Sequence, residues 1–207
     1  MGQHLSSEGA LDELKKAVHS LSNRGVVVFP TDTLYGLGAD VFSLPALQRV
    51  FSIKGRPADL ALPVLVADLD QVEAVALPMS GQARRLARRF WPGPLTLVMR
   101  RAPGLPDLVT GGADTVAVRM PSHPVPLELA RRLGRPITGT SANLSGQPDL
   151  LDLDALESQL GHLVDHIIQV GPVPLGTAST GVDITGDAPR LLREGAIPLK
   201  EVLEAVK

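Results

Sequence analysis

Apolar residues recur every three or four positions in several stretches of the chain, as expected for helices with one buried face. The first stretch runs from Leu11 to Leu21, and Gly25 follows where a helix of this length would stop. Pro45 can open a second helix that ends near Gly55. The same spacing predicts a helix that Ser80 caps and that carries Leu86, Ala87 and Phe90. Further helices are predicted at Val125–Leu133, near Leu153–Leu160 and at Pro198–Val206.

Short apolar runs between these helices predict strands. They lie at Val26–Pro30, Leu62–Val66, Leu95–Met99, Thr115–Met120, from Ile137 onward, at His166–Val170 and at Gly181–Thr185. Thr31 to Gly38, which follows the first strand, is expected to form a polar, glycine-bearing loop. The irregular alternation of helices and strands indicates an α/β or α+β fold with a mixed sheet. We interpret residues 1–207 as one domain with its core at about residues 10–200.

Composition excludes several classes of protein. The 207 residues include no cysteine, which rules out a disulfide scaffold, a thiolate zinc site and a cysteine nucleophile. The formal net charge of −2 offers no broad positive surface for nucleic acid, so any RNA contact would be local. No apolar run is long enough to cross a bilayer, and we expect a cytoplasmic protein without membrane contact. Met1 to Ser6 match a myristoylation pattern, but we interpret them as a frayed terminus.

Common catalytic motifs do not account for the chain. It lacks the P-loop and the dinucleotide-binding glycine pattern. The segment Gly139 to Asn143 resembles a nucleophile elbow, but Asn143 replaces the second glycine. His162 and His166 lie four residues apart without the glutamate of a zincin, so surface histidines are the default interpretation and no metal ligand is predicted.

Four arginines lie close together within residues 84–89. A solvated helix face opposite Leu86 and Phe90 is the favoured interpretation. The alternative is a patch that contacts tRNA phosphates.

Three polar segments follow apolar ones, where α/β proteins place ligands. They are Thr31 to Gly38, Lys54-Gly55-Arg56-Pro57, and Ser141-Ala142-Asn143 with the residues up to Gly146. Lysine and arginine in the second segment could converge on one polyphosphate, the first as a point charge and the second as a fork. Each segment taken alone could equally be a turn or a helix end.

Together these segments resemble the YrdC/Sua5 family of threonylcarbamoyl-AMP synthases. The matching strings follow the family's order and cover about residues 10–200: Pro30–Gly38, Lys54–Pro57, Trp91–Thr96, Val116–Pro121, Ser141–Gly146, Ser179–Asp183 and Leu192–Gly195. The resemblance is to the short form, without an additional C-terminal domain. It implies a twisted, largely β domain with a concave, positively charged groove.

The resemblance also implies an activity. The family forms threonylcarbamoyl-AMP and pyrophosphate from L-threonine, bicarbonate and ATP, with Mg²⁺ expected beside the phosphates. A separate transferase then uses the product to modify adenosine 37 of tRNA, and tRNA itself could also be a partner. The alternatives are a module of this fold that binds double-stranded RNA, and a nucleotide-binding regulator without turnover.

The family's signature maps onto Lys54, Arg56, Ser141 and Asn143, which the resemblance assigns to ATP phosphates and to catalysis. It implies further ATP contacts at Leu60, Thr115, Asp149 and Arg193, and threonine contacts at Thr33, Arg119, Gly139 and Ser179. Three positions depart from the family pattern: Leu60 replaces an asparagine, Leu65 a histidine found in some members, and Asp149 a serine or asparagine. These departures put individual contacts in doubt and leave the signature intact.

Overall fold

The computed structural model describes residues 8–206, so the Met1–Ser6 pattern lies outside the described residues. The helices are α1 Glu8–Ser22, α2 Leu44–Lys54, α3 Leu69–Val75, α4 Gly81–Phe90, α5 Asp107–Thr110, α6 Pro124–Leu133, α7 Leu153–Leu160 and α8 Leu199–Ala205. The strands are β1 Val27–Pro30, β2 Tyr35–Gly38, β3 Val64–Leu65, β4 Leu95–Arg100, β5 Thr115–Arg119, β6 Ile137–Thr138, β7 Thr140–Ser141, β8 His166–Ile167, β9 Thr180–Asp183 and β10 Arg190–Arg193.

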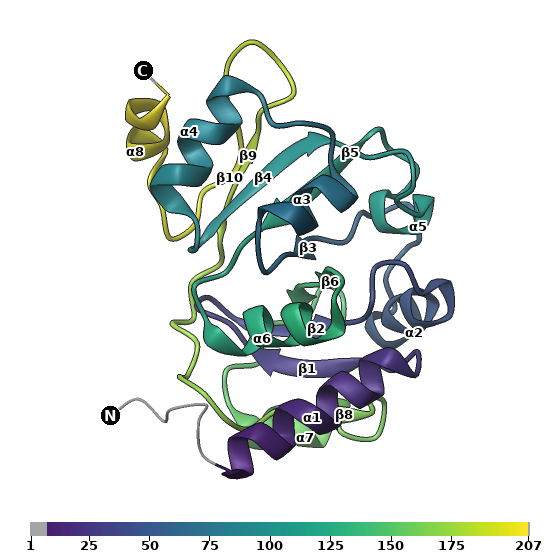
Figure 1. Ribbon diagram of the computed structural model, residues 1–207. Helices are drawn as coiled ribbons and strands as arrows, with labels where there is room; N and C mark the ends of the chain where they lie inside the picture. Colours follow the sequence, from purple (N-terminus) through teal and green to yellow (C-terminus); the bar gives the residue numbers. More distant parts are fainter. Residues whose placement is uncertain (1–7, 207) are drawn as a thin grey trace.

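The strands form two mixed sheets, which confirms the α/β class but divides the expected sheet in two (Figure 1). The smaller sheet has the order β7-β2-β1-β8, and the larger has the order β10-β9-β4-β5-β3-β6. Both contain parallel and antiparallel neighbours, for example β1 with β8 and β1 with β2. Helices α1 and α6 pack together beside the smaller sheet, whereas α4 and α8 pack together beside the larger one.

One loop prediction was wrong. Residues Tyr35–Gly38 form the buried strand β2, which pairs antiparallel with β1 through a tight turn at residues 31–34. The glycines misled the prediction because glycine usually marks a break in a strand. Here they make room for the Phe29 ring, since a Cβ on Gly38 would lie 2.3 Å from Phe29 Cε1 and one on Gly36 2.8 Å from Phe29 Cε2.

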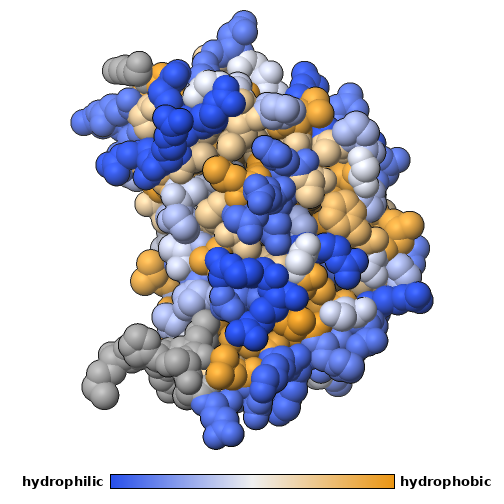
Figure 2. Space-filling view, viewed as in Figure 1, coloured by the Kyte–Doolittle hydropathy of each residue, from blue (hydrophilic) through white to orange (hydrophobic). Residues whose placement is uncertain are grey.

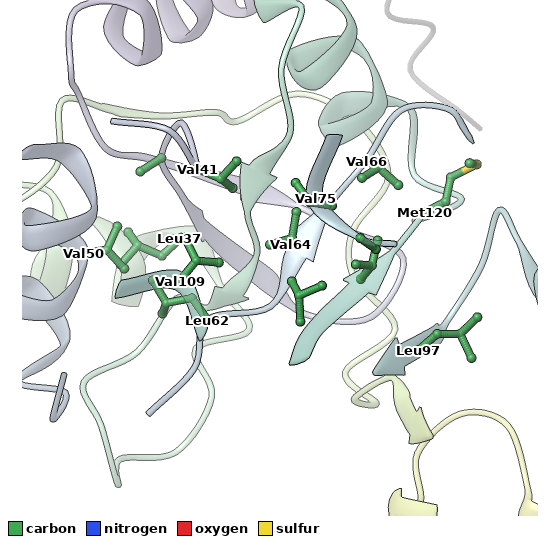
Figure 3. Packing of buried hydrophobic residues seen from close by; sticks show 14 of the residues in the cluster. Leu37, Val41, Val50, Leu62, Val64, Val66, Val75, Leu97, Val109 and Met120 are labelled. Carbon is green, nitrogen blue, oxygen red and sulfur yellow. The ribbon is translucent and has the colours of Figure 1, made fainter. Parts of the chain in front are cut away.

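Buried side chains from both sheets join in one large apolar cluster, which holds the sheets against each other. Leu37 of β2 and Val64 of β3 belong to this cluster, as does Leu97 of β4 (Figure 3). A second cluster includes Leu14 of α1 and Leu129 of α6, on the side of the smaller sheet. Burial of such apolar area is the main force that stabilises the fold.

The predicted helices are present, and their ends follow the expected signals. Ser80 accepts a hydrogen bond from the Ala83 amide at the start of α4, and Gly55 closes α2 in the left-handed conformation. The predicted strands are also present, though β3, β6 and β8 are shorter than expected. The sequence patterns missed α3, α5, β7 and β10, all of which have seven residues or fewer.

Candidate active site

A cavity of about 260 Å³ lies where the two sheets meet. Its wall combines the turn between β1 and β2, strand β7 and the ends of β4, β5 and β10. Eight of the twelve predicted site residues line it: Thr33, Arg56, Arg119, Gly139, Ser141, Asp149, Ser179 and Arg193. Three arginines and one aspartate are among the lining residues, so the cavity favours anionic ligands.

Arg119 at the end of β5 is the most deeply buried of these cations, with 5% of its surface exposed. Its Nη1 donates to Thr33 Oγ1 at 2.7 Å, its Nη2 donates to Asp32 Oδ1, and its Nε donates to the Gly93 carbonyl at 3.0 Å. Burial lowers the pKa of Arg119, and the charge of Asp32 acts in the opposite direction. The guanidinium therefore has a fixed orientation at the cavity wall, suited to a carboxylate ligand.

A second cation lies beside it. Arg193 of β10 donates from Nε to the Ser179 carbonyl and from Nη2 to Ser179 Oγ, both at 3.0 Å. Ser179 Oγ in turn lies 2.8 Å from Thr96 Oγ1. Arg119 and Arg193 are close enough that the charge of Arg193 lowers the pKa of Arg119. Two like charges this close are stabilised when an anion binds between them.

The resemblance assigns Lys54 to the ATP phosphates, and in the structure its ammonium is bound by oxygens of the protein itself. Lys54 is 3% exposed, and its Nζ donates to the Ser141 carbonyl at 2.6 Å, the Asn143 carbonyl at 2.8 Å and Asn143 Oδ1 at 2.9 Å. An ammonium has three donors, so all of them are engaged within the protein. Burial lowers the pKa of Lys54 to about 8, with Arg56 lowering it further and Asp149 raising it.

These contacts shape the segment that carries Ser141. Asn143 Oδ1 also accepts a hydrogen bond from Ser141 Oγ at 2.7 Å, and Asn143 Nδ2 donates to the Gln147 carbonyl at 2.7 Å. Lys54 and Asn143 do not line the cavity themselves, but they fix the position of Ser141, which does. In this structure, Lys54 thus acts on the cavity through the loop that it holds.

Arg56 and Asp149 also line the cavity, and both are close enough to Lys54 for their charges to shift its pKa. The Arg56 guanidinium donates to the carbonyls of Leu60 at 3.2 Å and Ala61 at 2.9 Å. Leu60 thus contributes a backbone oxygen, while its side chain is largely exposed and does not line the cavity. Thr115 does not line it either, since it starts β5 about 13 Å along the strand from Arg119.

Sequence reasoning missed several residues of this site. Asp32 was part of the first polar segment, but its role as the counter-ion of Arg119 was not predicted. Its second oxygen, Oδ2, is buried and accepts no hydrogen bond from any described residue. Thr31 and Thr96 also line the cavity. A polar run directly after a buried strand was the available signal, and it could not show which side chains face the ligand.

Leu65 and Gly139 form an apolar part of the wall. A Cβ on Gly139 would lie 2.4 Å from Leu65 Cγ, so the leucine occupies the space that a larger residue at position 139 would need. His166 lines a different cavity, and its Nε2 lies 3.0 Å from Glu13 Oε2. Within residues 8–206, no group of three or more potential ligands is placed to hold a metal ion, and no helix there has the length and apolar character to cross a membrane.

This fold is that of a known class of protein. The family model for Sua5, YciO and YrdC proteins, described as "Telomere recombination", matches residues 19–195, and the chain belongs to this family.

Among its relatives, a threonylcarbamoyl-AMP synthase of Pyrococcus abyssi is 42% identical over 181 residues, which is 87% of this chain and 53% of that protein. A threonylcarbamoyl-AMP synthase of Bacillus subtilis is 42% identical over 195 residues, covering 94% of this chain and 56% of the relative. The chain therefore spans about half the length of these curated relatives. A crystal structure of P. abyssi Sua5 complexed with L-threonine superposes with a TM-score of 0.89 at 41% identity, covering 93% of this chain and 56% of that one.

Proposed function

We propose that this protein is an L-threonylcarbamoyladenylate synthase, a nucleotidyltransferase that uses L-threonine, bicarbonate and ATP. The observation that carries the proposal is the convergence of Arg56, Arg119 and Arg193 on one cavity. The names of the two synthases and the threonine complex of P. abyssi Sua5 support it.

The reaction brings anions together. The amine of threonine takes up bicarbonate with loss of water and gives a carbamate. A carbamate oxygen then attacks the α-phosphorus of ATP, and the bond to the β-phosphate oxygen breaks so that pyrophosphate leaves. Because both reactants are negatively charged, their mutual repulsion raises the barrier, and fixed cations lower it. Such transfers depend on positioning and electrostatics more than on a protein nucleophile, which agrees with a chain that lacks cysteine.

We assign the inner end of the cavity to threonine. Arg119 would bind its carboxylate, and the hydroxyls of Thr33 and Ser179 would contact its polar groups. Leu65 and Gly139 would shape the apolar wall beside them. The burial of Arg119 supports this assignment, because an arginine in a site shielded from water binds a carboxylate more strongly.

We assign the outer end to ATP. Arg56 and Arg193 would contact the phosphates, and Ser141 would donate from its hydroxyl or amide. Lys54 and Asn143 would hold Ser141 in place. The predicted ATP contacts of Leu60 and Thr115 stay predictions, with the Leu60 carbonyl already engaged by Arg56.

One lining carboxylate fits the expected Mg²⁺. Magnesium in nucleotide sites takes one or two carboxylates together with phosphate oxygens and water. Asp149 would be that carboxylate, and the ion would offset the negative charge of the leaving pyrophosphate. A cage made of protein ligands alone is not required, in keeping with the absence of a ligand cluster among the described residues.

The product is a labile mixed anhydride, so a partner must collect it before water does. We propose a separate transferase that places the threonylcarbamoyl group on N6 of adenosine 37 in tRNA, with both proteins in the cytoplasm. Direct binding of tRNA to this chain is not needed for this scheme.

Pyrophosphate release tests the proposed function. Purified protein with ATP and Mg²⁺ is expected to release pyrophosphate when threonine and bicarbonate are both present, and to lose this activity when either is omitted. Serine in place of threonine serves as the matched substrate control. Pyrophosphate release that is independent of threonine would refute the proposal.

A further inference from the structure

A positively charged surface on α4 stands apart from the proposed active site. Arg84, Arg85, Arg88 and Arg89 are all exposed on this helix, which contains no acidic residue. Within the part of the chain that the structure describes, none of the four forms an ion pair with a carboxylate. Arg85 donates to the Val206 carbonyl at 2.9 Å, and Arg89 lies over the Phe90 ring. Arg84 and Arg88 therefore present charges that their own surroundings do not neutralise.

Other helices of this protein do neutralise their arginines. On α6, Glu128 accepts hydrogen bonds from both Arg131 and Arg132. On α2, Arg49 pairs with Asp165 at 2.7 Å. The helix dipole accounts for the positive charge of Arg88 and Arg89, which lie in the last turn of α4, but not for that of Arg84, which lies in its first half.

An apolar cavity of about 300 Å³ opens between these arginines. Arg84 and Arg88 line it together with Leu69, Met79, Ala87, Trp91 and Met120. Leu69 is 52% exposed, so apolar surface reaches the solvent at this point. Figure 2 shows deep blue atoms at the upper left, over α4, beside tan and orange ones. Apolar surface rimmed by unpaired polar groups is typical of a protein-binding site.

We propose that this α4 surface binds an acidic peptide segment of a partner protein, with one large apolar side chain placed between carboxylates. Arg84 and Arg88 are one turn apart and so lie on the same side of the helix, where each can pair with a carboxylate. The apolar side chain enters the cavity, where methionines and a tryptophan adapt to its shape. A nucleic-acid backbone would use the arginines but leave the apolar cavity unfilled, and the net charge of −2 also works against it.

The α4 surface lies directly behind Arg119. Met120 lines the apolar cavity beside α4, whereas its chain neighbour Arg119 lines the active-site cavity. Gly93 connects the two, since its amide donates to the Met120 carbonyl at 2.8 Å and its carbonyl accepts from Arg119 Nε at 3.0 Å. A partner bound at this surface would therefore contact the segment that orients the deepest cation of the active site.

Selection from random peptides tests the proposal without a known partner. Peptides of about 15 residues, roughly four helical turns, are displayed and selected on the wild-type protein. The enriched peptides are expected to carry aspartate or glutamate on both sides of a leucine, phenylalanine or methionine. Their affinity, measured by fluorescence anisotropy, is expected to fall about tenfold for the double variant Arg84→Gln/Arg88→Gln, and also with rising salt.

Matched variants make the outcome specific. Arg131→Gln/Arg132→Gln removes the same number of charges from α6 and should leave peptide affinity unchanged. Leu69→Gln, a change at a half-exposed position, should weaken binding without changing the charge. Failure to enrich acidic peptides, or equal binding to wild type and Arg84→Gln/Arg88→Gln, would overturn the proposal. So would a duplex RNA that binds through Arg84 and Arg88 when no peptide does.

Discussion

Replacing Lys54 with methionine is expected to destabilise the protein as well as to inactivate it. Methionine keeps the length of the side chain but removes the ammonium that donates three hydrogen bonds to the loop at residues 141–143. The lysine is almost fully buried, so water cannot replace these bonds without rearrangement. The oxygens of Ser141 and Asn143 would be left with fewer donors, and the loop would lose its fixed position.

The size of the effect follows from the number of bonds. A hydrogen bond to a charged group contributes about 1.5 kcal/mol or more, so three contribute about 4–5 kcal/mol. Methionine also removes the cost of burying a charge, which offsets part of the loss. We therefore expect the free energy of unfolding to fall by about 3 kcal/mol. Urea unfolding followed by circular dichroism measures this as a lower midpoint at unchanged slope.

Arg56→Met is the matched control. Arg56 is more exposed than Lys54 and donates to two loop carbonyls, so its loss should lower the free energy of unfolding by less than about 1 kcal/mol. Both variants should lose most pyrophosphate release, but for different reasons. If Lys54→Met unfolded within about 0.5 kcal/mol of wild type, the role of Lys54 in holding the loop would be wrong.

Further predictions concern the rest of the site. Arg119→Lys keeps the charge but not the fork, and should raise the KM for threonine about tenfold in the pyrophosphate assay while the KM for ATP changes little. Asp32→Asn leaves Arg119 buried without its counter-ion and should cost about 3 kcal/mol in urea unfolding. Gly139→Ala should cost about 2 kcal/mol by collision with Leu65, and adding Leu65→Ala should recover part of this loss. Burial lowers the pKa of Lys54 from 10.5 to about 8 in the folded protein. Between about pH 8 and pH 10.5, Lys54 is therefore protonated in the unfolded chain but largely neutral in the folded one. Ionisation of Lys54 therefore makes the free energy of unfolding increase with pH across that window, and urea unfolding of Lys54→Met at about pH 8 and about pH 10 should lack this increase.

Periodicity in the sequence was sufficient to predict the longer elements of the fold. Helices such as α1 and α6 bury one face, and the apolar residues of that face repeat every three or four positions in the sequence. This repeat can be recognised without knowing what the helix packs against. Strand β2 was missed because its glycines serve contacts with Phe29 on the neighbouring strand, which no local pattern records. The division into two sheets was missed for a similar reason, since strand pairing is set by contacts between distant segments.

The candidate site shows the same limit at the level of single side chains. Resemblance to a family indicated which residues gather, and eight of the twelve do line one cavity. It could not indicate which partner each cation binds, because the partners are distant in sequence. Lys54 donates to oxygens 87 to 89 positions away, and Arg119 pairs with Asp32 at a similar separation. These contacts divide the cations into two groups. Lys54 has every donor engaged within the protein, whereas Arg56, Arg119 and Arg193 line the cavity. An ammonium has three donors and Lys54 uses all of them, whereas a guanidinium has five and Arg119 uses three on Gly93, Thr33 and Asp32. The three arginines are therefore the cations expected to counter the charge of the substrates.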